Sequence, residues 1–412
     1  MFYYTIFEHL NISVDALTKV TSTRDDNFVY IQATLKPEYP VCTSCCSKQI
    51  VLKEYKTKTF KRTSPSGILY EAEIKIPRYK CKKCNKTYSQ EIEKQNNTKT
   101  PKSVLNKMKE MFLKPISFAD IADTFQMSVT QVIRIYDKLN FNYNAELSDA
   151  ICIDEFRNTG DSEQKYACVI ANFVEHNIVD ILPSRTLPYL REYMSKQPRN
   201  ALNSVKYIIT DMYDGYITIA REYFKNATIV IDPFHYMRYF TDALQRLRMK
   251  YKNYGYRDNA RFNKNRKLFT ADEDLLKDKK YTLINGETIS FKDRMSRFLA
   301  QNDELRTAYL LLQDYYFIVK NNRVTNALSF INEMIERMRN TEIAELIACS
   351  NTWEHYKNEI ANSFIIYKGK RLSNGPIEGI NSRIKTLKKV YCGYKNKRRF
   401  YTRVIAIINK GR

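Results

Sequence analysis

Two aspartates, Asp154 and Asp211, stand where carboxylates that hold divalent cations are often found. Asp154 follows the apolar run AICI and Asp211 follows the run YIIT, so each ends a predicted strand. Two-metal phosphoryl transfer needs carboxylates that converge from separate elements and leave coordination positions open, and adjacent strand ends bring such side chains together. For either aspartate alone, capping a helix or pairing with a lysine remains the alternative.

A third acid, Glu378, stands in basic surroundings. It is the only acid among the last 45 residues and lies in the first turn of a predicted helix, where the helix dipole favours a negative charge. Lys385 and Lys389 follow on a similar face of that helix. A carboxylate able to hold a metal would therefore lie beside lysines that suit phosphate groups, whereas a dipole-stabilising role explains only the position of Glu378.

Two further aspartates are first of all predicted helix caps. Asp214 is the better cap for the helix that follows Asp211, which leaves Asp211 available for another role. Asp232 precedes Pro233 at a helix start, a typical N-terminal pattern. A supporting role for Asp232 beside the metal, or a role as a spare ligand, is the alternative.

Four of the nine cysteines form two CxxC pairs in a chain whose start lacks the pattern of a secretory signal. Cys42 and Cys45 are separated from Cys81 and Cys84 by a spacer long enough for a β-hairpin. Four thiolates leave no open coordination position, so we predict one structural Zn²⁺. Cys46 adjoins Cys45, which leaves the choice between them open, and four unrelated thiols are the alternative.

The net charge of +23 is concentrated in two segments. Residues 48–108 contain 16 Lys/Arg against 5 Asp/Glu, and residues 368–412 contain 14 against 1. The lysines around the second CxxC pair are predicted to contact DNA phosphates. They are Lys80, Lys82, Lys83 and Lys86. In the second segment, basic residues alternate with aromatic ones suited to base stacking, namely Tyr391, Tyr394, Phe400 and Tyr401. Solvated lysine faces are the alternative to a polyanionic partner.

Residues 117–140 predict two short helices joined by a tight turn near Gln126 and Met127, with Ser117 and Ser128 as N-caps. Their predicted packing residues are Ile121, Ala122, Phe125, Val129, Val132 and Ile133. The exposed residues of the second helix, Thr130, Gln131 and Arg134, are of types that contact bases or phosphates. An ordinary helical hairpin is the alternative.

The remaining chain predicts a strand-rich start and a later α/β layer. Three runs between residues 28 and 80 have strand character, and alternating strands and helices follow from about 149 to 232. From Pro233 to about 370 the pattern is helical with no clear strand, and the last helix has its apolar residues on one face: Ile377, Ile380, Ile384 and Leu387. No apolar run is long enough to span a bilayer.

From about residue 42 to the C-terminus, the chain resembles insertion-sequence transposases of the ISL3 family. The resemblance rests on an ordered set of motifs: the paired cysteines, a helical segment beginning SFADIA, and then IDEF, ILPSR, TDMYDGY, IDPFHY and NGPIEGINSRIKTLKK. Two positions depart from the family pattern. Asn172 stands where many relatives have Asp, at a position expected near the acids, and Met127 replaces a smaller residue in the helical turn.

The resemblance implies a multidomain α+β protein in five parts. These are a zinc-ribbon β domain (1–100), a helix-turn-helix segment (101–145), the first part of an RNase H-like α/β catalytic core (146–235), a helical insertion (236–370), and the last core helix with the basic C-terminus (371–412). Asp154, Asp211 and Glu378 would be the DDE triad, holding two Mg²⁺ or Mn²⁺ ions. Asp232 and His235 occupy the family's D-x-F-H motif, and further expected backbone contacts are Arg238, Arg246 and Arg248.

The activity implied by the resemblance is metal-dependent cleavage and strand transfer at terminal inverted repeats. The expected partner is double-stranded DNA, bound by a homodimer or a higher oligomer, in the cytoplasm of a bacterium and associated with the nucleoid. Two alternatives remain at this point. One is a transposase-derived DNA-binding regulator without catalytic activity. The other is an RNase H-like nuclease or resolvase that cuts DNA strands without joining them to a target.

Overall fold

The structure is a computed structural model. It describes residue 7 and residues 12–26, 28–39, 41–63, 68–90, 102–139, 141–158, 164–250, 266–276, 278–283, 285–300, 302–321, 324–391 and 396–410. The chain divides into two compact units. Unit 1 comprises Met1–Tyr143 and Lys385–Arg412, and unit 2 comprises Asn144–Ile384.

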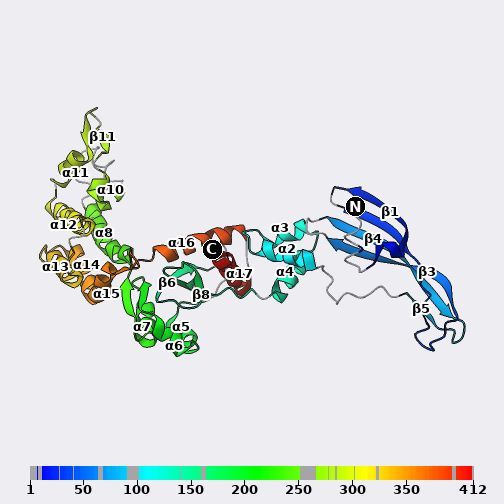
Figure 1. Cartoon of the computed structure of the whole chain (residues 1–412). Helices are drawn as coiled ribbons and strands as arrows, with labels where there is room; N and C mark the ends of the chain where they lie inside the picture. Colours follow the sequence, from blue (N-terminus) through cyan, green and yellow to red (C-terminus); the bar gives the residue numbers. More distant parts are fainter. Residues whose placement is uncertain are drawn as a thin grey trace. The chain divides into compact units, whose positions relative to one another are not determined.

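Unit 1 begins with a twisted sheet of order β1-β2-β4-β3, with β5 paired to β4 (Figure 1). Its strands are β1 (Leu17–Asp25), β2 (Phe28–Leu35), β3 (Ile50–Thr63), β4 (Leu69–Cys81) and β5 (Thr87–Ser89). The three predicted strand runs are confirmed as β2, β3 and β4, and β1 and β5 are additional. Alternate residues of β2 and β4, among them Ile31 and Ile74, are buried in one core, as expected for a sheet with one covered face.

The described part of unit 1 also contains four complete helices. They are α2 (Lys102–Phe112), α3 (Phe118–Thr124), α4 (Val129–Lys138) and α17 (Lys397–Lys410). Ser117 accepts the backbone N–H of Asp120 and Ser128 accepts that of Gln131, so both predicted N-caps are confirmed. The turn between α3 and α4 places Gln126 at a φ of 48°. This left-handed conformation, rare for a residue with a side chain, turns the chain without a glycine.

The C-terminal helix α17 packs with α2, α3 and α4, an arrangement that the sequence did not suggest. Ala406 lies in their common core. Arg403 is completely buried and donates to the carbonyl oxygens of Phe112 (2.9 Å) and Ile116 (2.7 Å). Arg399 pairs with the Asp137 carboxylate through two hydrogen bonds. These contacts tie the end of the chain to the helical pair.

Unit 2 contains a five-stranded mixed sheet of order β10-β9-β6-β7-β8. The strands are β6 (Ala150–Arg157), β7 (Tyr166–Asn172), β8 (Ile178–Leu182), β9 (Tyr207–Thr210) and β10 (Thr228–Ile231). β6, β7 and β8 are antiparallel, whereas β9 is parallel to both β6 and β10. All five strands were predicted, and each is largely buried, as expected for a sheet that helices cover.

Among the helices that pack on this sheet are α5 (Leu187–Ser195), α6 (Arg199–Ser204) and α7 (Asp214–Tyr223). Their side chains Leu190, Leu202 and Tyr216 share a buried cluster with Ile153 of β6 and Ile208 of β9. All three helices fall within the alternation of strands and helices predicted from about 149 to 232. This packing supports the edge of the sheet at which β6 and β9 end.

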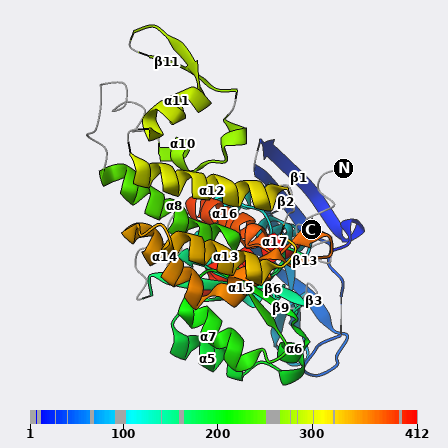
Figure 2. The ribbon, with the colours of Figure 1, turned by 90° about the vertical axis from the view of Figure 1, so that its left-hand side faces the viewer.

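The predicted helical insertion forms a second core in unit 2. It comprises α8 (Pro233–Lys250), α10 (Arg266–Thr270), α11 (Phe291–Leu299), α12 (Asp303–Lys320), α13 (Ala327–Arg339), α14 (Ala344–His355) and α15 (Lys357–Ala361). Helices α8, α12, α13 and α14 lie alongside one another (Figure 2). Trp353 is completely buried in this core, and its indole N–H donates to the Tyr236 carbonyl oxygen at 3.1 Å.

The expectation of no strand in this segment was wrong. Two short hairpins occur, β11 (Lys280–Thr282) with β12 (Thr288–Ser290), and β13 (Ile366–Tyr367) with β14 (Lys370–Arg371). The second hairpin turns at Lys368 and Gly369, which have φ values of 48° and 76°. Two consecutive positive φ values are typical of the tight hairpin turn that fits the strand twist. Strands of two or three residues are too short to produce a detectable alternating pattern.

Helix α16 (Gly375–Val390) is the predicted last helix, and the division between the units falls within it. Its four predicted apolar residues are all buried, namely Ile377, Ile380, Ile384 and Leu387. In the described part of the chain, no helix combines the length and the apolar character needed to cross a membrane.

Candidate active site

The parallel pairing of β6 and β9 brings Asp154 and Asp211 together. The last paired residues are Ile153 and Thr210, and each aspartate is the next residue on its strand. Neighbouring parallel strands are only about 5 Å apart, so consecutive positions at the same level lie side by side. Asp154 does not end its strand as predicted, because β6 continues to Arg157 through its pairing with β7. Only the pairing of β6 with β9 ends just before Asp154.

Glu155 joins these two aspartates in a cluster of acids. One carboxylate oxygen from each of Asp154, Glu155 and Asp211 lies within 4.8 Å of the others. Alternation along a strand places neighbouring side chains on opposite faces, so the sequence did not suggest Glu155 as a partner. Three carboxylates in this space are the kind of oxygen donor set that Mg²⁺ and Mn²⁺ prefer.

Burial, together with the proximity of the acids, raises the pKa values of the two aspartates. Burial is the largest cause that raises the pKa of Asp154 to about 7, and the charges on Asp211, Glu155 and Glu378 act in the same direction. Burial and then the charge on Glu155 raise the pKa of Asp211 to about 6, against the opposing effect of His235. Repulsion between neighbouring carboxylates is expected where they form a binding site for a cation.

Glu155 already has partners of its own. Arg185 donates to its Oε1 at 2.7 Å, and the Tyr216 hydroxyl donates to its Oε2 at 3.3 Å. The Arg185 guanidinium also lies over the rings of Tyr166 and Tyr213, at 4.6 and 4.5 Å from their centres. Glu155 therefore holds Arg185 beside the two aspartates, in addition to contributing a negative charge.

Glu378 lies outside the 4.8 Å cluster, on an exposed position of α16, yet it is close enough for its charge to raise the pKa of Asp154. One turn further along the same helix, Asn381 contacts Asp154 directly, with its Nδ2 2.8 Å from Asp154 Oδ2. The structure thus places α16 beside β6 and brings Glu378 near the aspartates. Asn381 was not singled out from the sequence, although it lies in the NGPIEGIN motif.

The D-x-F-H residues lie beside this cluster. Asp232 is buried and accepts the backbone N–H of Phe234 at 3.0 Å, which confirms its capping position at the start of α8. Its other oxygen accepts the backbone N–H of Asn374 at 2.7 Å, just before α16. His235, in the first turn of α8, is near enough to Asp211 to lower its pKa. Asp232 therefore joins two segments that border the acids.

Two sequence interpretations near the acids need correction. Asp214 does not cap α7 through its side chain, because its carboxylate accepts the Tyr356 hydroxyl instead. Asn172 pairs with Ile151, three residues before Asp154 on β6, which places it about 10 Å along the strand from the acids. Its side chain contacts Glu146, Ser148 and Asn177 instead. Asn172 therefore supports the local backbone and not the acid cluster.

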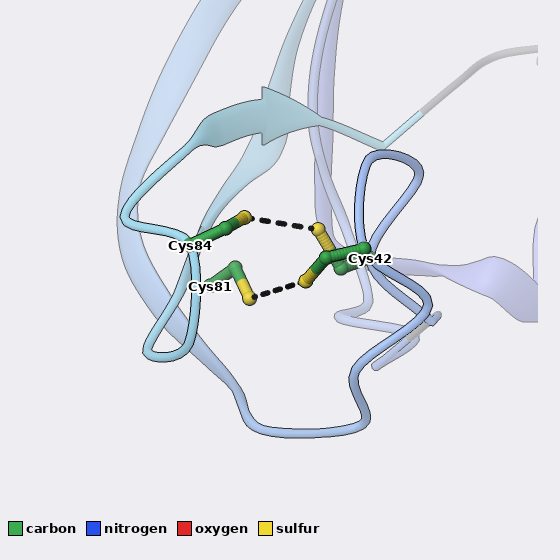
Figure 3. Close-up of side chains that lie close together, drawn as sticks. Cys42, Cys81 and Cys84 are labelled. Atoms are coloured by element: carbon green, nitrogen blue, oxygen red, sulfur yellow. Dashed lines mark hydrogen bonds between the residues drawn. The ribbon is translucent and has the colours of Figure 1, made fainter.

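The cysteines form a second candidate metal centre, in unit 1 (Figure 3). Sulfur atoms of Cys42, Cys45, Cys81 and Cys84 all lie within 4.8 Å of one another, and Cys46 lies outside this group. The spacer between the CxxC pairs folds as the β3–β4 hairpin, as expected. Backbone N–H groups, that of Cys84 most strongly, lower the pKa of Cys81 to about 6, whereas burial and the neighbouring thiols raise the pKa of Cys45 to about 12. Lowered thiol pKa values favour the thiolate that binds a metal.

The predicted DNA-contacting side chains are exposed. This holds for Thr130, Gln131 and Arg134 of α4, for the knuckle residues Lys82 and Lys83, and for Lys385 and Lys389 of α16. Val129 was predicted to pack between α3 and α4, but its side chain is 42% exposed, because it lies at the first position of α4 on the outer face.

Several side chains expected to meet nucleic acid are buried instead. Tyr391, Phe400 and Tyr401 belong to the protein interior, so they have no free ring face for base stacking. Tyr394 lies outside the described residues. Arg248, expected to contact DNA backbone, is 8% exposed and bonds to Gln245 Oε1. The alternation of aromatic and basic residues in residues 368–412 therefore reflects the packing of helices.

Comparison with known proteins agrees with this geometry. The sequence model of the ISL3 family of DDE transposases, described as "Transposase", matches residues 151–404, which include the acid cluster, the helical insertion and α16. A relative from Bordetella parapertussis, the "Transposase for insertion sequence element IS1001", is 23% identical over 243 residues, or 59% of this chain. The match spans 57% of that relative's length. The chain therefore belongs to the ISL3 family of DDE transposases.

Proposed function

We propose that this transposase cuts DNA at terminal inverted repeats and joins the freed ends to target DNA, using a metal centre built on Asp154 and Asp211. The observation that carries this proposal is their placement at matching positions of adjacent parallel strands. The mixed sheet around them also supports the RNase H-like core that the family resemblance implies.

The chemistry of the donor set fits divalent cations. Two Mg²⁺ or Mn²⁺ ions held there would activate a water molecule and stabilise the charge that develops on the phosphodiester. Asp154 and Asp211 would supply oxygen ligands to these ions. Arg185, held by Glu155 between two tyrosine rings, has the charge and planar shape that suit a phosphate oxygen near them.

For the third ligand we propose Glu378. The charge of the Glu155 carboxylate is already paired with the Arg185 guanidinium, whereas Glu378 is exposed at the start of α16, and its charge reaches Asp154. Comparison of Glu378→Gln with Glu155→Gln tests this assignment. Loss of Mn²⁺ binding in Glu378→Gln with retention in Glu155→Gln would support it, and the reverse result would assign Glu155 as the ligand.

We also propose that unit 1 recognises the DNA ends. The cysteine cluster would hold one structural Zn²⁺ and present Lys82 and Lys83 to phosphates, while α3 and α4 would act as a helix-turn-helix with Thr130, Gln131 and Arg134 directed to the major groove. Their exposure supports this role. Because the reaction joins two ends, we propose a homodimer on double-stranded DNA.

The decisive experiment incubates purified protein with the terminal DNA of its own insertion sequence and Mg²⁺ or Mn²⁺. The wild type should nick the ends and join them to target DNA, and Asp154→Asn should bind the same DNA without cutting it. A wild-type protein that binds the ends and neither nicks nor joins would refute the catalytic proposal and favour a DNA-binding regulator. Nicking without joining would favour a nuclease or resolvase.

A further inference from the structure

Asn381 connects the acid cluster to the helix that carries Glu378. It follows Glu378 by three residues on α16, so both side chains leave the helix on the same side. Its Nδ2 donates to Asp154 Oδ2 at 2.8 Å and to the Glu155 carbonyl oxygen at 3.3 Å. The side chain is 7% exposed, although Glu378, one turn earlier, is exposed to solvent.

The start of α16 is held by a second contact, on the other side of Glu378. Asp232 Oδ1 accepts the backbone N–H of Asn374, which immediately precedes α16. Asp232 is 3% exposed, so water competes little for this bond. Glu378 therefore lies between two hydrogen-bonded points, one at the start of α8 and one on β6.

We propose that Asn381 is a positioning residue that orients Asp154 for a divalent cation and aligns α16 with the end of β6. Asp154 Oδ1 accepts the backbone N–H of Glu155 at 2.7 Å, and its Oδ2 accepts Asn381. Each oxygen still has a lone pair for a cation. A neutral amide orients the carboxylate without cancelling its charge, whereas a lysine or arginine would compete with the metal for it.

The other atom of the Asn381 amide supports a functional role. Its Oδ1 is buried and has no hydrogen-bond partner among the described residues. An unsatisfied buried acceptor costs stability, so this asparagine is not the side chain that folding alone would favour. A leucine of similar volume fills the same space but donates no hydrogen bond, so comparing its effect on metal binding with its effect on stability separates the positioning role from a structural one.

The test measures Mn²⁺ binding by the full-length protein, and the inference rests on the proposed function. Asn381→Leu should weaken Mn²⁺ binding about 10-fold or more, as measured by electron paramagnetic resonance of the free ion, because Asp154 loses its orienting donor. The urea midpoint followed by Trp353 fluorescence should fall no further than that of the control variant Asn362→Ala, which also loses an amide donor. Strand cleavage should then require a correspondingly higher Mn²⁺ concentration.

Asn362→Ala is the matched control. Asn362 also uses its amide Nδ2 in unit 2, donating to the Ile229 carbonyl oxygen at 2.8 Å, and it is not part of the acid cluster. This variant should lower the urea midpoint and leave Mn²⁺ binding unchanged.

An unchanged Mn²⁺ affinity in Asn381→Leu would overturn the proposal, as would an equal loss of affinity in Asn362→Ala. Wild-type protein that binds no Mn²⁺ would overturn both this proposal and the metal-dependent function. Wild-type protein that binds Mn²⁺ but cuts no terminal DNA would refute the proposed transposition alone, because the binding comparison still decides the role of Asn381.

Discussion

Replacement of Asp154 by asparagine should abolish DNA cutting and yet stabilise the metal-free protein. Burial, aided by nearby acids, raises the pKa of Asp154 from its ordinary 3.8 to about 7. Between these values the folded state holds a proton that the unfolded chain releases. The contribution of Asp154 to stability is therefore fully present below about pH 4 and is lost as the pH rises to about 7.

The size of this effect follows from the two pKa values. Each pKa unit corresponds to about 1.4 kcal/mol, so a change from 3.8 to about 7 gives an upper limit of roughly 4 kcal/mol. Water reaches part of the carboxylate, and Asp211 titrates with it, so we expect about half of this limit. Asp154→Asn should thus gain about 2 kcal/mol over the wild type near pH 8 and a little under 1 kcal/mol near pH 5, where the wild type has lost about a third of the effect.

Trp353 makes this measurement specific to unit 2. It is the single tryptophan of the chain and is completely buried, so its fluorescence during urea unfolding reports on this unit alone. The solutions contain a chelator, and the wild type is compared with Asp154→Asn near pH 5 and near pH 8. Added Mg²⁺ should then stabilise the wild type more than the variant, because a ligand stabilises the state that binds it.

Asp149→Asn is the control. Asp149 is not part of the acid cluster. It pairs with Lys206, which lowers the pKa of Asp149, so its replacement should not stabilise the protein. If the wild type and Asp154→Asn lose the same stability between the two pH values, the raised pKa inferred for Asp154 is wrong.

Three further predictions concern unit 1. The wild-type protein should contain one zinc ion and Cys81→Ser should lose it, and an unchanged zinc content would refute the ligand assignment. Arg134→Ala should weaken binding to terminal DNA about 10-fold in a mobility-shift assay, and equal binding would exclude this side of α4 from the interface. Arg403→Met leaves the carbonyl oxygens of Phe112 and Ile116 without their buried donor, which should cost roughly 3 kcal/mol. Hydrogen exchange in α2 should then be faster, and unchanged exchange would show that α17 does not hold this unit together.

Features set by short stretches of chain were accessible from the sequence. Ser117 and Ser128 are N-caps because their hydroxyls reach backbone N–H groups only three residues away. The CxxC pairs form one cluster because each pair lies in its own turn, and the spacer closes as a hairpin. Asp154 and Asp211 were identified because each follows an apolar strand, even though β6 continues past Asp154.

Only the tertiary structure decided which distant groups meet these residues. Asn381 and Asp154 are 227 positions apart, and no local pattern of α16 shows that its amide reaches β6. Glu155 joins the cluster against the expected alternation of a strand, since Arg185 and Tyr216 hold its carboxylate. Burial of Ala406 depends on packing of α17 with α2, α3 and α4, which are more than 250 residues away in the sequence. Periodicity identifies the buried face of a helix, whereas the surface that covers it depends on how the whole chain packs.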